Sequence, residues 1–164
     1  MADLKISFED FLMEVPPESQ AFTSELHNYF LSNGCIEKYQ LAKNGIVVSY
    51  TFIKSKRVIA NFVFRKSGLI IRIYADFIPS YADFLNSLPQ PMLKSIDKAP
   101  VCKRLIDPEK CSSRCKMGYS FTLLDNDYKK CRFNCFMFNI NTENNPFIKD
   151  FISNEINARD LHSA

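Results

Sequence analysis

Cysteine is the residue type in this chain whose spacing could most directly do chemistry. Five of the six cysteines lie between residues 102 and 135, and four of them form two C-x3-C pairs. The pairs are Cys111 with Cys115 and Cys131 with Cys135. Thiols at this spacing can bind zinc, form a redox pair, or pack in a core as small apolar residues. The sequence leaves these three interpretations open.

The first pair is the better candidate for metal binding. Cys111 and Cys115 lie in an irregular segment, and the lysines and arginine around them favour the thiolate form. Cys131 and Cys135 lie in a predicted strand, where residues four apart are roughly 13 Å apart and cannot share one metal. Cys135 is therefore predicted to be a core residue. The zinc hypothesis uses Cys102, Cys111, Cys115 and Cys131.

Arginine provides the second candidate chemistry. The net charge of +3 is unevenly distributed, with six bases and no acid in residues 54–72, and eight bases against four acids in residues 101–135. This segregation predicts a positive face, and the arginine fork suits phosphate or carboxylate. The predicted ligand is an anionic small molecule or a nucleic acid, because sheet faces with aromatic and basic side chains bind single strands. The predicted ligand-binding residues are Arg65, Arg72, Tyr74, Asn61, Arg104 and Arg132. The competing interpretation is that these arginines pair with acids of nearby helices.

Motifs for catalysis are absent from the sequence. It has no G-x-G-x-x-G, P-loop, H-E-x-x-H or G-x-S-x-G pattern. The two histidines, His27 and His162, are far from the cysteines in sequence, and we expect His27 on a helix surface. A binding domain is therefore favoured over an enzyme.

The elements that would position these residues can be predicted from periodicity and turn residues. Asn44-Gly45 is typical of a hairpin turn, and short links join four successive strands, which predicts an antiparallel meander. We expect these four strands at 37–43, 46–53, 58–65 and 69–74. We expect helices at 8–12, 17–33, 81–88, 92–96 and 145–156, and a second hairpin formed by 118–124 and 128–140.

The predicted fold is α+β, with one domain over residues 1–164 and the element order ααββββααββα. The antiparallel sheet consists of the four-stranded meander plus the later hairpin, and helices pack on one face. Ile46, Val48 and Tyr50 mark that apolar face, whereas Asn61 and Arg72 project from the opposite, amphipathic face.

Composition limits the protein class further. The 15 phenylalanines and only 4 glycines favour a packed aromatic core. No apolar run approaches the ~20 residues of a membrane span, and the N-terminus lacks a signal-peptide pattern. We expect a cytoplasmic protein with no membrane partner, in which cysteines stay reduced. The sequence predicts no particular protein partner.

Residues 61–138 resemble a group of small bacterial proteins that have no established activity. The similarity rests on the stretches 61–74, 102–108 and 128–133, and on the pattern Cys111-x3-Cys115-x2-Gly118-Tyr-x-Phe121. It implies a bacterial, cytoplasmic protein. The element order is also loosely similar to YjbR/MmcQ-like α+β domains, some of which are described as DNA-binding.

Overall fold

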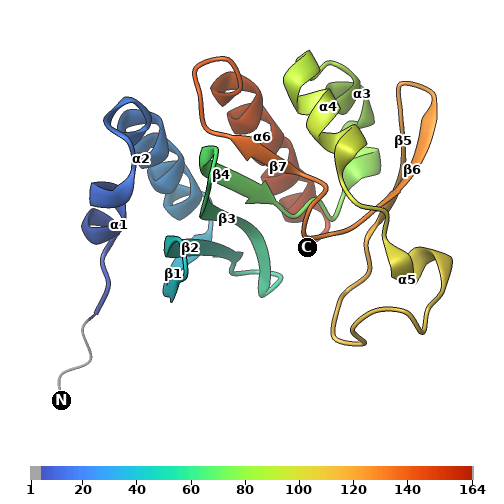
Figure 1. Cartoon of the computed structure of the whole chain (residues 1–164), viewed down its shortest axis with the longest axis horizontal. Helices are drawn as coiled ribbons and strands as arrows, with labels where there is room; N and C mark the ends of the chain where they lie inside the picture. The colour runs from blue at the N-terminus through green and yellow to red at the C-terminus, as the bar shows by residue number, and fades with distance from the viewer. Residues whose placement is uncertain (1–4, 164) are drawn as a thin grey trace.

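Most strands and helices form where the apolar periodicity predicted them, whereas the short helix α5 (Lys103–Ile106) was not predicted. The computed structural model describes residues 5–163 and confirms the α+β class (Figure 1). The helices are α1 (Phe8–Glu14), α2 (Pro17–Ser32), α3 (Ala82–Asn86), α4 (Gln90–Lys98), α5 (Lys103–Ile106) and α6 (Asn145–Leu161), with a 3₁₀ turn η1 (Ile78–Tyr81). The strands are β1 (Cys35–Ala42), β2 (Gly45–Phe52), β3 (Arg57–Arg65), β4 (Gly68–Ile73), β5 (Tyr119–Leu123), β6 (Asn126–Lys130) and β7 (Met137–Asn139).

The main sheet has five antiparallel strands in the order β1-β2-β3-β4-β7. The predicted meander and its first hairpin are confirmed, but the turn lies one residue earlier than predicted, at Lys43-Asn44, because Ala42 pairs with Gly45. Strand β7 comes from the far end of the sequence and pairs with β4, with Ile71 opposite Phe138. The sheet therefore brings the C-terminal third of the chain beside the meander.

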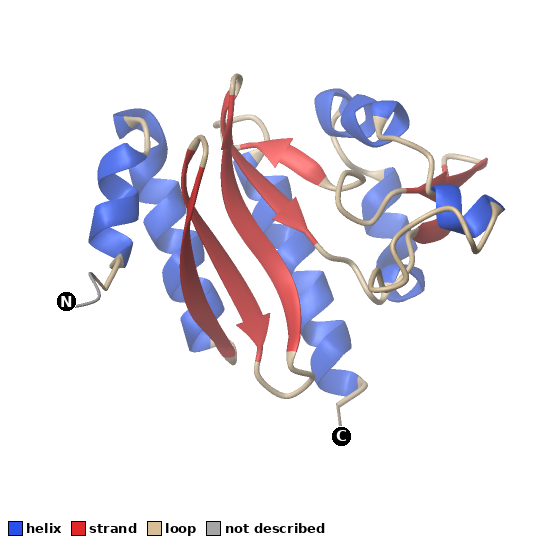
Figure 2. Ribbon diagram, turned by 60° about the horizontal axis from the view of Figure 1, so that its bottom comes forward, coloured by secondary structure: helices blue, strands red, loops and turns tan. Residues whose placement is uncertain are grey.

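One face of the sheet is apolar and covered. Burial alternates strictly along β2 and β4, with Ile46, Val48, Tyr50 and Phe52 buried on β2. Helices α2 and α6 lie behind this face in Figure 2, which leaves the opposite face of the long strands toward the viewer. The opposite face carries Lys38, Ser49, Thr51, Asn61 and Arg72, as the strand register shows. The predicted contrast between the two faces is thus confirmed.

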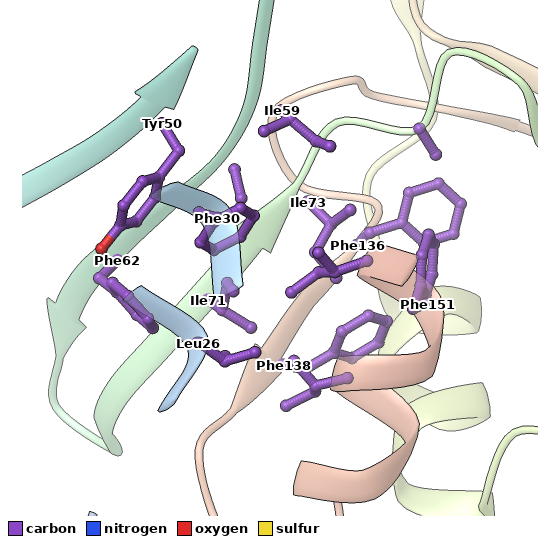
Figure 3. Packing of buried hydrophobic residues seen from close by; sticks show 14 of the residues in the cluster. Leu26, Phe30, Tyr50, Ile59, Phe62, Ile71, Ile73, Phe136, Phe138 and Phe151 are labelled. Atoms are coloured by element: carbon purple, nitrogen blue, oxygen red, sulfur yellow. The ribbon is translucent and has the colours of Figure 1, made fainter. Parts of the chain in front are cut away.

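The core is a single cluster of buried apolar residues, rich in aromatic rings (Figure 3). Phe30 stacks on Tyr50 with 4.2 Å between ring centroids, and Phe151 of α6 meets Phe136 edge to face at 5.1 Å. His27 is also buried, contrary to the prediction of a surface position. Its Nδ1 lies 2.8 Å from the Tyr50 hydroxyl, and its ring stacks on Phe8. The helix turns this face inward because Thr23, Leu26 and Phe30 share it.

The later hairpin differs from the prediction. Strands β5 and β6 form a separate two-stranded sheet, and their turn uses Leu124 and Asp125, both at positive φ. The predicted strand 128–140 is interrupted because residues 131–135 form one helical turn, closed by a 2.9 Å hydrogen bond from the Cys135 N–H to the Cys131 carbonyl. This turn separates β6 from β7, so β7 joins the main sheet.

Within residues 5–163, no helix combines the length and apolar character needed to cross a membrane.

Candidate functional site

Two basic stretches of the sequence meet at one hollow in the surface, here called the basic cleft. The cleft has a volume of about 280 Å³ and lies between the β2–β3 turn, the residue after β4 and the segments on either side of β5–β6. Its lining is Lys56, Arg57, Val58, Tyr74, Arg114, Cys115, Lys116, Arg132 and Phe133. Five of these nine side chains are cationic and none is acidic.

The β2–β3 turn supplies one wall of the cleft. Lys56 takes a left-handed conformation with φ of +57°, and its N–H bonds to the Phe52 carbonyl at 2.9 Å. This tight turn places Lys56 directly before β3 and Arg57 at the start of that strand.

The segment between α5 and β5 supplies the opposite wall, with Arg114, Cys115 and Lys116. Arg104 holds this segment, because its Nη1 donates to the carbonyl oxygens of Ser112 and Cys115. At the end of this segment, the backbone of Gly118 packs directly against Cys102. A Cβ added at Gly118 would lie 2.7 Å from the Cys102 sulfur. A glycine is therefore required where this segment packs against the buried thiol.

Two aromatic rings form the third side. Tyr74 and Phe133 meet edge to face with their centroids 6.0 Å apart. Tyr74 is almost buried and packs under the guanidinium of Arg132, 5.2 Å from its ring centroid. Phe133 is 45% exposed, so its ring is available in the cleft.

A buried ion network lies beside the cleft. The carboxylate of Asp76 forms ion pairs with three arginines, with N···O distances of 2.9 Å to Arg132, 3.1 Å to Arg159 and 3.3 Å to Arg57. Arg159 is 1% exposed and also donates to the carbonyls of residues 57, 58 and 74. These bonds tie α6 to the strand ends that shape the cleft.

The second carboxylate of the network is Glu155, which is fully buried. Burial raises the pKa of Glu155 above its ordinary value, and Arg159 opposes this shift. Glu155 accepts hydrogen bonds from Tyr81 Oη at 2.7 Å, from Arg159 Nε at 3.0 Å and from the Phe77 N–H at 3.1 Å. Three arginines thus face two carboxylates, which leaves excess positive charge next to the cleft.

This network was not predicted from the sequence. Asp76, Glu155 and Arg159 are not among the predicted site residues. A signal was present, because positions 155 and 159 lie on the same helical stripe as Ile148, Ile152 and Ile156. A glutamate and an arginine four residues apart on a buried stripe indicate an internal ion pair.

The predicted ligand-binding residues are only partly brought together. Tyr74 and Arg132 line the basic cleft. Arg132 is also paired with an acid, but this acid, Asp76, lies in the loop after β4 and not on a helix as the competing interpretation expected. Arg72 and Asn61 are partners on the open sheet face, with Arg72 Nη1 3.4 Å from Asn61 Oδ1. Arg65 lies at the far end of β3 opposite Gly68. Arg104 lies outside the lining and supports the segment that carries Arg114 and Lys116.

The cysteines do not converge. All six are free, and over the described residues no three histidine, cysteine or acidic side chains form a group that could hold a metal ion. Of the proposed zinc ligands, Cys102 is buried, Cys111 is exposed, and Cys115 and Cys131 are partly exposed. Cys135 is fully buried as predicted, and burial raises the pKa of its thiol. The strand-spacing argument for Cys131 and Cys135 was wrong, because they flank a helical turn.

Comparisons with protein-family models, with curated proteins and with solved structures found no match. The resemblance of residues 61–138 to small bacterial proteins therefore stays a prediction. The fold and the cleft define an α+β domain with a cationic, aromatic-lined hollow at the edge of an open sheet face.

Proposed function

We propose that the protein is a cytoplasmic binding domain for an anionic ligand, a small molecule or nucleic acid, which it holds by phosphate in the basic cleft. The single observation that carries this proposal is the meeting of five cationic side chains, without any acid, around one hollow. The six free thiols fit a reducing compartment.

Neighbouring acids neutralise only part of the charge around the cleft. Arg57 and Arg132 share the carboxylate of Asp76, which also pairs with Arg159. No ion pair involves Lys56, Arg114 or Lys116 within residues 5–163. A phosphate group offers several acceptor oxygens at once, so it suits this convergence of donors.

Arg57 has hydrogen-bonding capacity left for a ligand. Its Nη2 pairs with Asp76, but its buried Nε finds no partner in the described part of the chain. A buried donor without a partner costs about 1–3 kcal/mol, so Asp76 does not satisfy the whole guanidinium of Arg57.

Calorimetric titration with pyrophosphate at low salt tests the proposal. The variant Arg114→Ser with Lys116→Ser removes two exposed cations of the cleft. The matched control, Lys43→Ser with Lys66→Ser, removes the same charge from two exposed positions outside the basic cleft. We expect the cleft variant to bind roughly tenfold or more weakly, with a shallower salt dependence, and the control to bind as the wild type does. Absence of binding by the wild type, or equal weakening in both variants, would contradict the proposal.

A further inference from the structure

We propose that the ligand of the basic cleft is a nucleotide unit, whose base stacks on Phe133 and whose phosphate is held by the cationic wall. This inference rests on the proposed function and adds to it the requirement for a planar ring.

Phe133 stands apart from the other phenylalanines of the chain. Of the 15 phenylalanines, 14 belong to the core cluster or pack against it, which leaves Phe133 alone. Phe133 is 45% exposed, and the part of its apolar surface that stays in water gains nothing for folding. Its place in the lining of a cationic cleft gives this exposed surface a use.

The position of Phe133 is fixed before any ligand arrives. Its carbonyl oxygen accepts a 2.6 Å hydrogen bond from Arg72 Nε, and the helical turn of residues 131–135 holds its backbone. Tyr74 contacts its ring edge to face. A fixed ring loses little conformational entropy when a base stacks on it, so preorganisation favours binding.

Aromatic and cationic groups line the same hollow, so one ligand can reach both. The volume of about 280 Å³ lies at the lower end of small-molecule sites, as expected for a single nucleotide unit. A stacked base with basic side chains on its phosphate is how proteins hold single strands without reading sequence. Such a unit can come from a free nucleotide or from a single strand.

The neighbouring surface can accept the rest of a strand. Arg72 links the cleft to the open sheet face, where Lys38, Ser49 and Thr51 project and Asn61 is buried beside Arg72. Among these side chains there is no acid to repel a phosphate backbone.

The test compares adenosine monophosphate with ribose 5-phosphate, which carries the same phosphate but no base. We expect adenosine monophosphate to bind about tenfold more tightly, a ratio typical of one stacked base. Phe133→Leu should abolish this ratio, and Phe133→Tyr, which keeps a stacking ring, should preserve it. Equal binding of the two ligands, or a ratio unchanged in Phe133→Leu, would overturn the inference.

The two proposals fail separately. If ribose 5-phosphate and pyrophosphate bind, and Arg114→Ser with Lys116→Ser weakens both, the anion site stands even when the base adds nothing. A further arm uses an oligothymidylate of about ten nucleotides, within the usual site size of single-strand binders. If the protein binds this strand more tightly than adenosine monophosphate, the nucleotide unit belongs to a single-stranded nucleic acid. If it binds the strand more weakly, the ligand is a free nucleotide.

Discussion

The guanidinium of Arg72 is bonded to the backbone of Phe133, with Nε 2.6 Å from the carbonyl oxygen. The two residues are 61 positions apart in sequence, and the bond joins strand β4 to the turn that carries the exposed ring. Arg72 was predicted to contact a ligand directly. That contact stays a prediction, and in the structure Arg72 connects the open sheet face to the aromatic side of the cleft.

This bond makes Arg72 a positioning residue for Phe133. We expect Arg72→Ala to reduce the preference for adenosine monophosphate over ribose 5-phosphate by roughly fivefold, the equivalent of one hydrogen bond of about 1 kcal/mol. Pyrophosphate affinity should change little. Arg65→Ala is the matched control, because Arg65 is exposed at the far end of β3. An unchanged preference in Arg72→Ala would show that Phe133 does not depend on this bond.

The buried network around Arg159 should be essential for stability. Arg159→Met leaves Glu155 buried without its ion-pair partner, and we expect it to lower the free energy of unfolding by about 3–5 kcal/mol. Urea denaturation followed by circular dichroism measures this loss. Lys54→Ala breaks the exposed pair with Asp160 and should cost no more than about 1 kcal/mol. A cost below 1 kcal/mol for Arg159→Met would contradict the role given to the network.

The buried His27 predicts a pH dependence of stability. Burial lowers the pKa of His27, whereas its pKa in the unfolded chain is about 6.5. The unfolded state therefore binds the proton more tightly, so this contribution to stability is present above about pH 6.5 and is lost as pH falls toward the lower folded pKa.

Urea denaturation of wild type and His27→Gln between pH 5 and pH 8 isolates this effect, because the carboxylates are common to both. The stability difference between the two proteins should shrink as pH falls below about 6.5. A difference that is constant across the range would mean that His27 does not change its charge on unfolding in this window.

The fold could be predicted from the sequence more fully than the site. Alternation along residues 46–73 and the Asn44-Gly45 signal predict the meander, because both are local, although the turn itself forms at Lys43-Asn44. The alternating pattern around residues 131–135 does not indicate the helical turn there, so the sequence predicted one continuous strand in place of β6 and β7. The charge pattern located both basic stretches, but their meeting at the cleft depends on tertiary packing between residues 56–57 and 114–116.

The cysteine pattern illustrates the same limit. Two C-x3-C pairs suggest a shared metal, yet thiols bind one ion only if their sulfurs converge, and these do not. We expect protein purified under reducing conditions to contain well under one equivalent of zinc by elemental analysis. One equivalent that is lost in Cys111→Ser with Cys115→Ser would restore the zinc hypothesis.

The central claim is that anions bind in the basic cleft, and Cys115 allows the most direct measurement. Cys115 lines the cleft, whereas Cys111 is exposed outside it. Alkylation of each thiol by iodoacetamide can be followed by mass spectrometry during titration with pyrophosphate. We expect the rate at Cys115 to fall in proportion to the occupancy of the cleft, while the rate at Cys111 stays constant. Unchanged alkylation of Cys115 at a pyrophosphate concentration that saturates calorimetric binding would contradict the claim, because the anion would then bind elsewhere.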